Sequence, residues 1–148
     1  HYRDRELVVI GVLKGCCVFM ADFVKKLKAD VRVYFMEISS YQSGTVSNGK
    51  ITIKKDLDVD IEGKDVLIAE DIIDSGNTLS QLTEILKERK PNSIKVCTLL
   101  SKPARRQVEF EADYTGFEIE DKFIIGYGLD CAEQFRQLPY IAEVELYD

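Results

Sequence analysis

The strongest constraint on the fold is a set of three apolar, strand-like runs, the first of them continuous, which alternate with stretches of helical periodicity. The runs occupy residues 7–12, 65–70 and 93–100. A strand that is buried on both faces reads as a continuous apolar run, which is typical of parallel sheets. Apolar residues then recur every three or four positions over 16–28 and 77–90. This alternation predicts an α/β fold with a central, mainly parallel, twisted sheet flanked by helices.

The rest of the chain is predicted to add strands and one long loop. Short strands are expected at residues 31–38, 51–54, 114–119, 123–126 and 141–146. Residues 39–50 are rich in Ser, Gly and Asn, which is typical of a loop. A length of 148 residues suits a single domain over 1–148.

Composition excludes several classes of protein. No apolar run approaches the roughly 20 residues of a membrane span, and the polar start HYRDRE resembles no secretion signal. A net charge of −6 argues against broad nucleic-acid binding. The four cysteines lack CxxC spacing, so we expect reduced thiols in a cytoplasmic protein rather than zinc ligands. Cys16 and Cys17 are expected to pack on the sheet as small apolar groups.

The segment after residues 65–70 carries the residues with the most chemistry. Ligands of parallel sheets bind at the carboxyl ends of strands, which here follow positions 12, 70, 100 and 126. Gly76 permits a turn with positive φ, and the first amides of the next helix are unpaired donors. The loop therefore predicts a cradle for one phosphate group, formed by Asp74, Ser75, Gly76, Asn77 and Thr78. Neither GxxxxGK[ST] nor GxGxxG occurs here.

Three acids beside the phosphate cradle need a separate explanation, because carboxylates repel phosphate. Glu70, Asp71 and Asp74 can accept hydrogen bonds from ribose hydroxyls, or Glu70 and Asp71 can hold Mg²⁺. A ribose that carries a phosphate would account for both features, the phosphate cradle and the adjacent acids. Two alternatives are a receiver domain and a plain helix start capped by Ser75 or Asp74. A receiver domain would have an Asp after the next strand, where this chain has Ser101 and Lys102.

Six motifs in order resemble one family over residues 7–147. They are LKG at 13–15, SY at 40–41, EDIIDSGNT at 70–78, LLSKP at 99–103, KFIIGYGLD at 122–130 and FR at 135–136. The chain resembles the type I phosphoribosyltransferases, and among them the 6-oxopurine branch of bacterial hypoxanthine phosphoribosyltransferases. The resemblance implies the type I phosphoribosyltransferase fold with a small base-binding hood. Departures are Asn77, Gly44-Thr45, Cys131 and an N-terminal helical segment that is absent or shortened.

The resemblance implies a reaction. A phosphoribosyl group would pass from phosphoribosyl diphosphate to a 6-oxopurine base, hypoxanthine or guanine, with Mg²⁺ as cofactor. The products would be a purine nucleoside monophosphate and diphosphate. Glu70 and Asp71 would hold the ribose hydroxyls or Mg²⁺, and Asp74 would be the general base at N7 of the purine.

The resemblance also implies roles for the remaining site residues. The diphosphate would contact Lys14, Gly15 and Arg136. The peptide between Leu13 and Lys14 would be cis. Asp130 would bind a second Mg²⁺. Lys102 would donate to O6 of the base, Phe123 would stack on it, Ile124 would read its edge, and Ser40 and Tyr41 would belong to a loop that closes over the site.

Taken singly, these residues have ordinary interpretations. Lys102 and Arg136 would be surface charges and Phe123 a core residue, while Arg105 and Arg106 are interpreted as solvent-exposed basic residues scattered over the surface.

The family implies a homodimer or homotetramer. A regulator that senses phosphoribosyl diphosphate and binds nucleic acid is the alternative from another class, and a xanthine–guanine preference is the nearest alternative enzyme.

Overall fold

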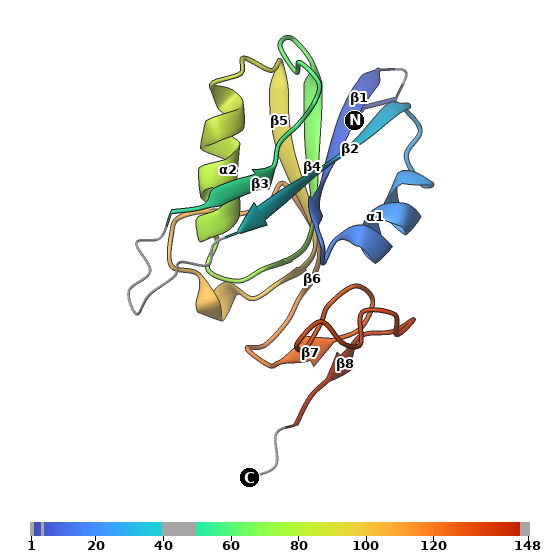
Figure 1. The fold of residues 1–148 in the computed structure, drawn as a ribbon, viewed down its shortest axis with the longest axis vertical. Coiled ribbons are helices and arrows are strands. Elements are labelled where there is room, and N and C mark those ends of the chain that lie inside the picture. The colour runs from blue at the N-terminus through green and yellow to red at the C-terminus, as the bar shows by residue number, and fades with distance from the viewer. Residues whose placement is uncertain (1, 4, 40–49, 146–148) are drawn as a thin grey trace.

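A central sheet organises the structure, which is a computed structural model that describes residues 2–3, 5–39 and 50–145. Its strands are β1 (Glu6–Leu13), β2 (Asp30–Ser39), β3 (Thr52–Lys55), β4 (Asp65–Ile73), β5 (Ser93–Ser101) and β6 (Tyr114–Glu118). The order is β3-β2-β1-β4-β5-β6, and all neighbours are parallel except β2 and β3 (Figure 1). The predicted mainly parallel sheet is confirmed.

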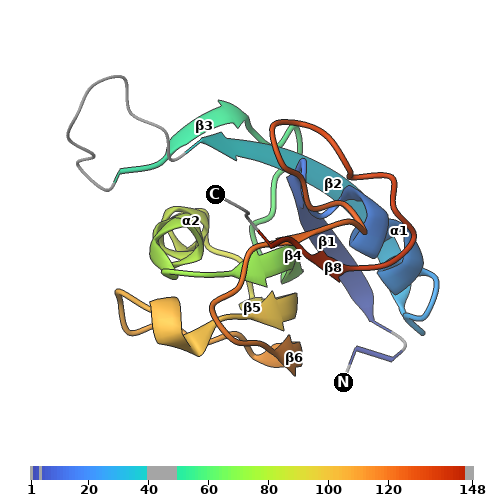
Figure 2. The same cartoon turned by 90° about the horizontal axis from the view of Figure 1, so that it is seen from below.

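Two helices cover opposite faces of this sheet, α1 (Cys17–Val24) and α2 (Asn77–Lys87) (Figure 2). Side chains along β1 alternate between the faces. Val8 and Ile10 belong to the core on the α2 side, whereas Leu7 and Val9 belong to the core on the α1 side. All four side chains are almost fully buried. Burial on both faces is the reason that residues 7–12 of β1 form a continuous apolar run.

Both helices are shorter than their apolar periodicity predicts. The helix expected to reach residue 28 ends at Val24, where the Lys26 and Leu27 amides turn back to carbonyls only three residues earlier. Leu27 nevertheless packs on the core, so the apolar period outlasts the helix. The second helix ends at Lys87 rather than at Lys90, which adopts a positive φ of 57°. Among the residues described, neither helix is long and apolar enough to cross a membrane.

A small hood follows the main sheet in the chain. It contains the antiparallel strands β7 (Ile124–Ile125) and β8 (Ala142–Glu143), and Figure 1 shows it beyond one end of the main sheet. Both strands are shorter than expected. The sequence also gave no prediction of the 3₁₀ turn η1 (Pro103–Arg105), which follows β5. The hood implied by the resemblance is therefore present as a separate two-stranded sheet.

The hood rests on the end of β1 and on α1. Gly128 lies so close to Gly15 that a Cβ at position 128 would overlap the Gly15 carbonyl oxygen. The Tyr127 hydroxyl donates a hydrogen bond to the Asp22 carboxylate, which raises the pKa of Tyr127 to about 12 and keeps the phenol protonated at neutral pH. Cys16 is buried beneath this region as expected, but Cys17 is exposed, so the prediction for Cys17 was wrong.

Candidate active site

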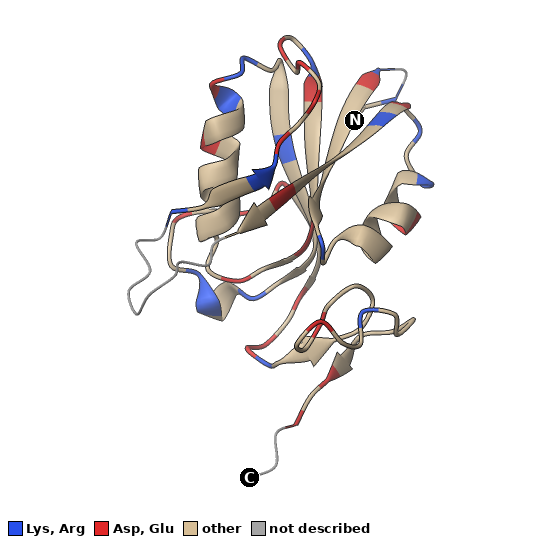
Figure 3. Ribbon diagram, viewed as in Figure 1, with Lys and Arg blue, Asp and Glu red and all other residues tan. Residues whose placement is uncertain are grey.

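The carboxyl ends of β1, β4 and β5 lie at the edge of the sheet that faces the hood (Figure 1). Strand β4 continues three residues past its predicted end, because Ile72 and Ile73 pair with Leu100 and Ser101 of β5. The prediction that this strand ends at Glu70 was therefore wrong. Glu70 and Asp71 both lie within β4. Figure 3 shows acidic residues along the ribbon in this region and basic residues on the neighbouring η1.

The loop between β4 and α2 has the geometry expected of the phosphate cradle. Gly76 has a φ of 84°, as the predicted tight turn requires. Gly76 itself is the N-cap of α2, so the alternative of a helix capped by Ser75 or Asp74 is not the arrangement found. The Asn77 amide instead donates to the Ser75 hydroxyl at 3.2 Å. This places one hydroxyl and the positive end of a helix at the same point.

Two cavities meet at this loop. The first has a volume of about 320 Å³ and is lined by the ends of β1 and β4 and the start of α2, including Gly15, Glu70, Asp71, Ser75, Gly76 and Thr78. The second has a volume of about 290 Å³ and is lined by Lys102, Arg105, Phe123, Ile124, Leu129 and Asp130. Ile72 and Asp74 line both cavities. A ligand that filled both would therefore pass Asp74.

The two adjacent acids form an electrostatically costly pair. Glu70 is only 8% exposed, and burial raises its pKa well above the usual range, with a further rise from the charge of Asp71. Asp71 lies directly against the turn after β1, because a Cβ on Gly15 would overlap its carboxylate. Two neighbouring carboxylates repel one another, and oxygen donors of this kind suit Mg²⁺.

The donor set fits a magnesium ion that is completed by substrate oxygens. No three acidic, histidine or cysteine side chains of the described residues are grouped closely enough to enclose a metal by themselves. Mg²⁺ is commonly held by one or two carboxylates together with substrate phosphates, which Glu70 and Asp71 can provide. Asp130 lies elsewhere, in the wall of the second cavity, where it accepts a hydrogen bond from the Glu133 amide.

Lys14 and Arg136, which the resemblance assigned to diphosphate, are brought together by a residue that the sequence did not single out. The Glu133 carboxylate lies 2.8 Å from Lys14 Nζ and 3.0 Å from Arg136 Nη2. Arg136 Nη1 also donates to the Gly128 carbonyl at 2.7 Å. The Leu13–Lys14 peptide is cis, as the resemblance implied. The two cations thus share one anion between β1 and the hood.

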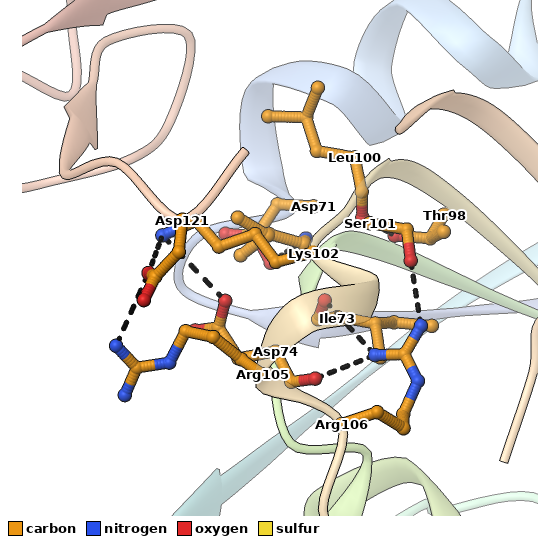
Figure 4. A network of polar contacts seen from close by, with 11 residues as sticks. Asp71, Ile73, Asp74, Thr98, Leu100, Ser101, Lys102, Arg105, Arg106 and Asp121 are labelled. Carbon is orange, nitrogen blue, oxygen red and sulfur yellow. Dashed lines mark hydrogen bonds and ion pairs between the residues drawn. The ribbon is translucent and has the colours of Figure 1, made fainter. Parts of the chain in front are cut away.

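The residues expected around the base lie in the second cavity. Lys102 Nζ is 3.8 Å from Asp74 Oδ1 and 3.9 Å from Asp121 Oδ1 (Figure 4). Its side chain is 9% exposed, so the interpretation as a surface charge was wrong. Phe123 is 47% exposed, which makes the core interpretation wrong and leaves its ring accessible. Ile124 is half-buried in β7 beside it.

Other residues of the site were missed or misjudged. Asp121 and Glu133 have no sequence motif of their own, and only the fold brings them beside Lys102 and Lys14. Arg106 was interpreted as solvated, yet its side chain is only 11% exposed and contacts the loop after β4. Its neighbour Arg105 is exposed, as expected. Ser40 and Tyr41, expected in the closing loop, lie outside the described residues.

Comparison with known proteins agrees with this geometry. A family model described as a phosphoribosyl transferase domain matches residues 1–132. The chain is 50% identical over 144 residues to the hypoxanthine-guanine phosphoribosyltransferase of Staphylococcus epidermidis, which covers 97% of this chain and 80% of that protein. The solved structure of a hypoxanthine-guanine phosphoribosyltransferase from Bacillus anthracis has a TM-score of 0.92 and 51% identity, covering 97% of this chain and 85% of that one.

A longer relative matches only in part. The chain is 54% identical over 141 residues to the bifunctional protein TilS/HprT of Listeria monocytogenes, and it spans 22% of the length of that protein. The match covers 95% of this chain. Together with the order of motifs, the paired cavities and the hood, these similarities show that the chain belongs to the phosphoribosyltransferase family, in its hypoxanthine phosphoribosyltransferase group.

Proposed function

We propose that this chain is a Mg²⁺-dependent transferase of purine salvage, which moves the 5-phosphoribosyl group of phosphoribosyl diphosphate to N9 of hypoxanthine or guanine. The bond from C1′ to the diphosphate oxygen breaks as the bond from N9 to C1′ forms. The products are a purine nucleoside monophosphate and diphosphate. The observation that carries the proposal is Asp74, which lines both cavities and lies 3.8 Å from the buried Lys102.

The first cavity takes the sugar and its phosphate. Ser75, Gly76 and Thr78 line it where α2 begins, so backbone amides and hydroxyls can hold the 5′-phosphate, with Asp74 and Asn77 completing the loop. Glu70 and Asp71 face the same cavity and accept hydrogen bonds from the ribose hydroxyls or hold Mg²⁺. When bound, Mg²⁺ supplies positive charge against the diphosphate.

The second cavity takes the base. The Lys102 ammonium donates to O6 of the purine, the accessible Phe123 ring stacks on it, and Ile124 main-chain groups read its edge. Asp74 accepts the N7 proton as N9 attacks, which prevents positive charge from accumulating on the ring. Hypoxanthine and guanine both present O6 and N7, so these contacts suit either.

The departing diphosphate needs cations and a water-free site. Lys14 and Arg136 lie on either side of Glu133 at the hood end of β1, next to Gly15, and an anion of higher charge can replace that carboxylate. We assign a second Mg²⁺ contact to Asp130. A loop that contains Ser40 and Tyr41 is assigned to closure over the site, since exclusion of water protects the activated ribose from hydrolysis.

Family resemblance supports further parts of the proposal. Residues 1–148 would act as one domain, in a homodimer or homotetramer in the cytoplasm. The exposed apolar side chains of Val33, Tyr114 and Phe117 on β2 and β6 offer surface for such contacts. We do not propose nucleic acid as a partner. Binding of a phosphodiester backbone needs a basic surface, whereas this chain has a net charge of −6 and an acidic loop at the site.

A substrate comparison tests the proposal. Rates should be measured with phosphoribosyl diphosphate, Mg²⁺ and each of hypoxanthine, guanine, xanthine and adenine. We expect transfer to the first two. Asp74→Ala should lower kcat at least about a hundredfold, as loss of a general base does, whereas Asp60→Asn, at a remote exposed acid, should not. A rate for Asp74→Ala within a few-fold of the parent would show that Asp74 is not the base.

A further inference from the structure

The loop that carries Asp74 is supported from behind by residues that follow η1. Two consecutive side chains there, Arg106 and Gln107, contact the loop, although neither belongs to the cavities described above. Arg106 Nη1 donates to the Asp74 carbonyl at 2.6 Å and to the Ile73 carbonyl at 3.3 Å (Figure 4). These bonds fix the peptide groups from which the Asp74 side chain projects.

The same guanidinium connects the loop to the sheet. Arg106 Nη2 donates to the Ser101 hydroxyl at 2.7 Å, at the end of β5, while Nε lies 3.2 Å from Glu111. The planar fork of an arginine can serve partners on several sides at once, which a lysine cannot. The side chain is 11% exposed, so these bonds are partly shielded from water and are stronger than surface contacts.

The support extends along the whole loop. A Cβ on Gly76 would lie 3.1 Å from Arg106 Cδ, so the arginine stem packs directly against the turn. The Gln107 amide donates to the Ser75 carbonyl at 2.8 Å, and Asn77 Nδ2 donates to Gln107 Oε1 at 2.9 Å. Every residue from 73 to 77 is therefore touched by Arg106 or Gln107.

We propose that Arg106 is a positioning residue of the phosphoribosyl transfer reaction, which holds the loop from Ile73 to Asn77 in the shape that aims Asp74 at the base and the loop amides at the 5′-phosphate. Gln107 completes the support through Ser75 and Asn77. Arg106 lines neither cavity, so we place it outside contact with either substrate. It acts through the carbonyl groups of the loop, which would otherwise be free to rotate away.

This inference rests on the proposed function, and its consequence for kinetics is specific. The loop amides bind the phosphate, so loss of Arg106 should raise the KM for phosphoribosyl diphosphate. Asp74 accepts the proton, so kcat should fall as well. We expect changes of at least about tenfold in kcat/KM for Arg106→Met, because a misplacement of about 1 Å at a reacting group can cost about a hundredfold in rate. Arg106→Lys keeps the charge and part of the bonding and should be intermediate.

The matched control is Arg89→Met. Arg89 makes two hydrogen bonds of 2.8 Å to Asp56 at the far end of α2, so its loss removes a comparable ion pair without touching the loop. We expect Arg89→Met to lower thermal stability and to leave kcat and KM unchanged. Glu111→Gln, which removes the ionic partner of Arg106 but none of its loop bonds, should change kcat/KM much less than Arg106→Met.

Amide hydrogen exchange of the 73–79 segment, measured without substrate, separates this inference from the proposed function. Arg106→Met should speed exchange in that segment relative to the parent, and Arg89→Met should not. Equal exchange in both variants, or kinetics of Arg106→Met and Arg106→Lys within about twofold of the parent, would overturn the positioning role. Absence of transfer by the parent would instead refute the proposed function, and the exchange data would still decide whether Arg106 orders the loop. If Arg106→Met fails to fold, Arg106→Lys decides both measurements.

Discussion

Substitution of Gly15 by alanine should damage catalysis while sparing the fold. A Cβ at this position would lie 1.8 Å from Asp71 Oδ2 and 2.7 Å from Asp71 Cγ, whereas ordinary contacts begin at 3.4 Å. To restore ordinary contact, Asp71 Oδ2 must move by about 1.6 Å and Asp71 Cγ by about 0.7 Å. The φ of Gly15 is outside the left-handed region, so alanine brings no backbone strain there. The perturbation is therefore confined to the place where Asp71 meets the turn after β1.

The expected loss follows from this displacement. A shift of about 1 Å at a positioned group can cost about a hundredfold in rate, so we expect kcat/KM for phosphoribosyl diphosphate to fall by about 10- to 100-fold. The free energy of unfolding should change by less than about 1 kcal/mol, because replacing glycine also restricts the unfolded chain. Steady-state kinetics at saturating hypoxanthine measure kcat/KM, isothermal titration measures the affinity for phosphoribosyl diphosphate, and urea denaturation measures the free energy of unfolding.

Gly63→Ala provides the opposite control. Gly63 has a φ of 74° with no other atom within 4 Å of a Cβ, so alanine there meets strain but no steric overlap. It should lower the free energy of unfolding by about 1 kcal/mol, the usual cost of a left-handed non-glycine residue, and leave kinetics intact. If Gly15→Ala were as active as Gly63→Ala, the contact between Gly15 and Asp71 would have no part in substrate binding.

Further predictions concern the core, the paired cations and pH. Leu82→Ala, at a fully buried position of α2, should cost about 2–5 kcal/mol in urea denaturation, and a smaller loss would mean that the α2 core collapses around the deletion. Glu133→Gln should lower the inhibition constant of diphosphate a few-fold, because Lys14 loses the carboxylate that now competes for it; weaker inhibition would instead make Glu133 part of the binding site. Hydrogen bonds from Ser93 and Asn92 lower the pKa of Asp65, so its folded form resists protonation. The stability that Asp65 contributes is present above its ordinary pKa of about 3.9 and is lost as pH falls through the lower pKa of the folded state. Ser93→Ala should reduce this loss of stability in acid. Denaturation should be measured between pH 2 and 6, about two units on either side of the ordinary pKa.

The central architecture could be predicted because it is set by local patterns. Apolar runs predicted the buried strands, and apolar residues at helical spacing predicted the helices, to within a few residues at their ends. The ends were less accurate. Strand β4 extends to Ile73 because β5 supplies ladder partners, and that pairing is tertiary. The helix expected to reach residue 28 stops at Val24 although Leu27 still packs on the core, so periodicity reports burial rather than helical hydrogen bonding.

The site was predictable where it is continuous in sequence. Gly76 was placed by the need for a positive φ, and the acids of β4 were singled out by their position after an apolar run. Arg106 could not be recognised in the same way. An arginine beside another arginine carries no local sign of which one is buried, and only the fold turns Arg106 toward the loop and leaves Arg105 exposed. Glu133 likewise gains its role only when the hood meets β1.

The two cavities share a wall but are otherwise built from different parts of the chain. Ile72 and Asp74 are common to both, but the remaining lining residues come from different segments. Most of the cavity proposed for the sugar and phosphate belongs to β1, β4 and α2, and most of the cavity proposed for the base belongs to the end of β5 and the hood. Such an enzyme is modular. Because most lining residues of the two cavities come from different segments, substitutions in the hood should alter the choice of base while leaving most of the lining of the first cavity in place.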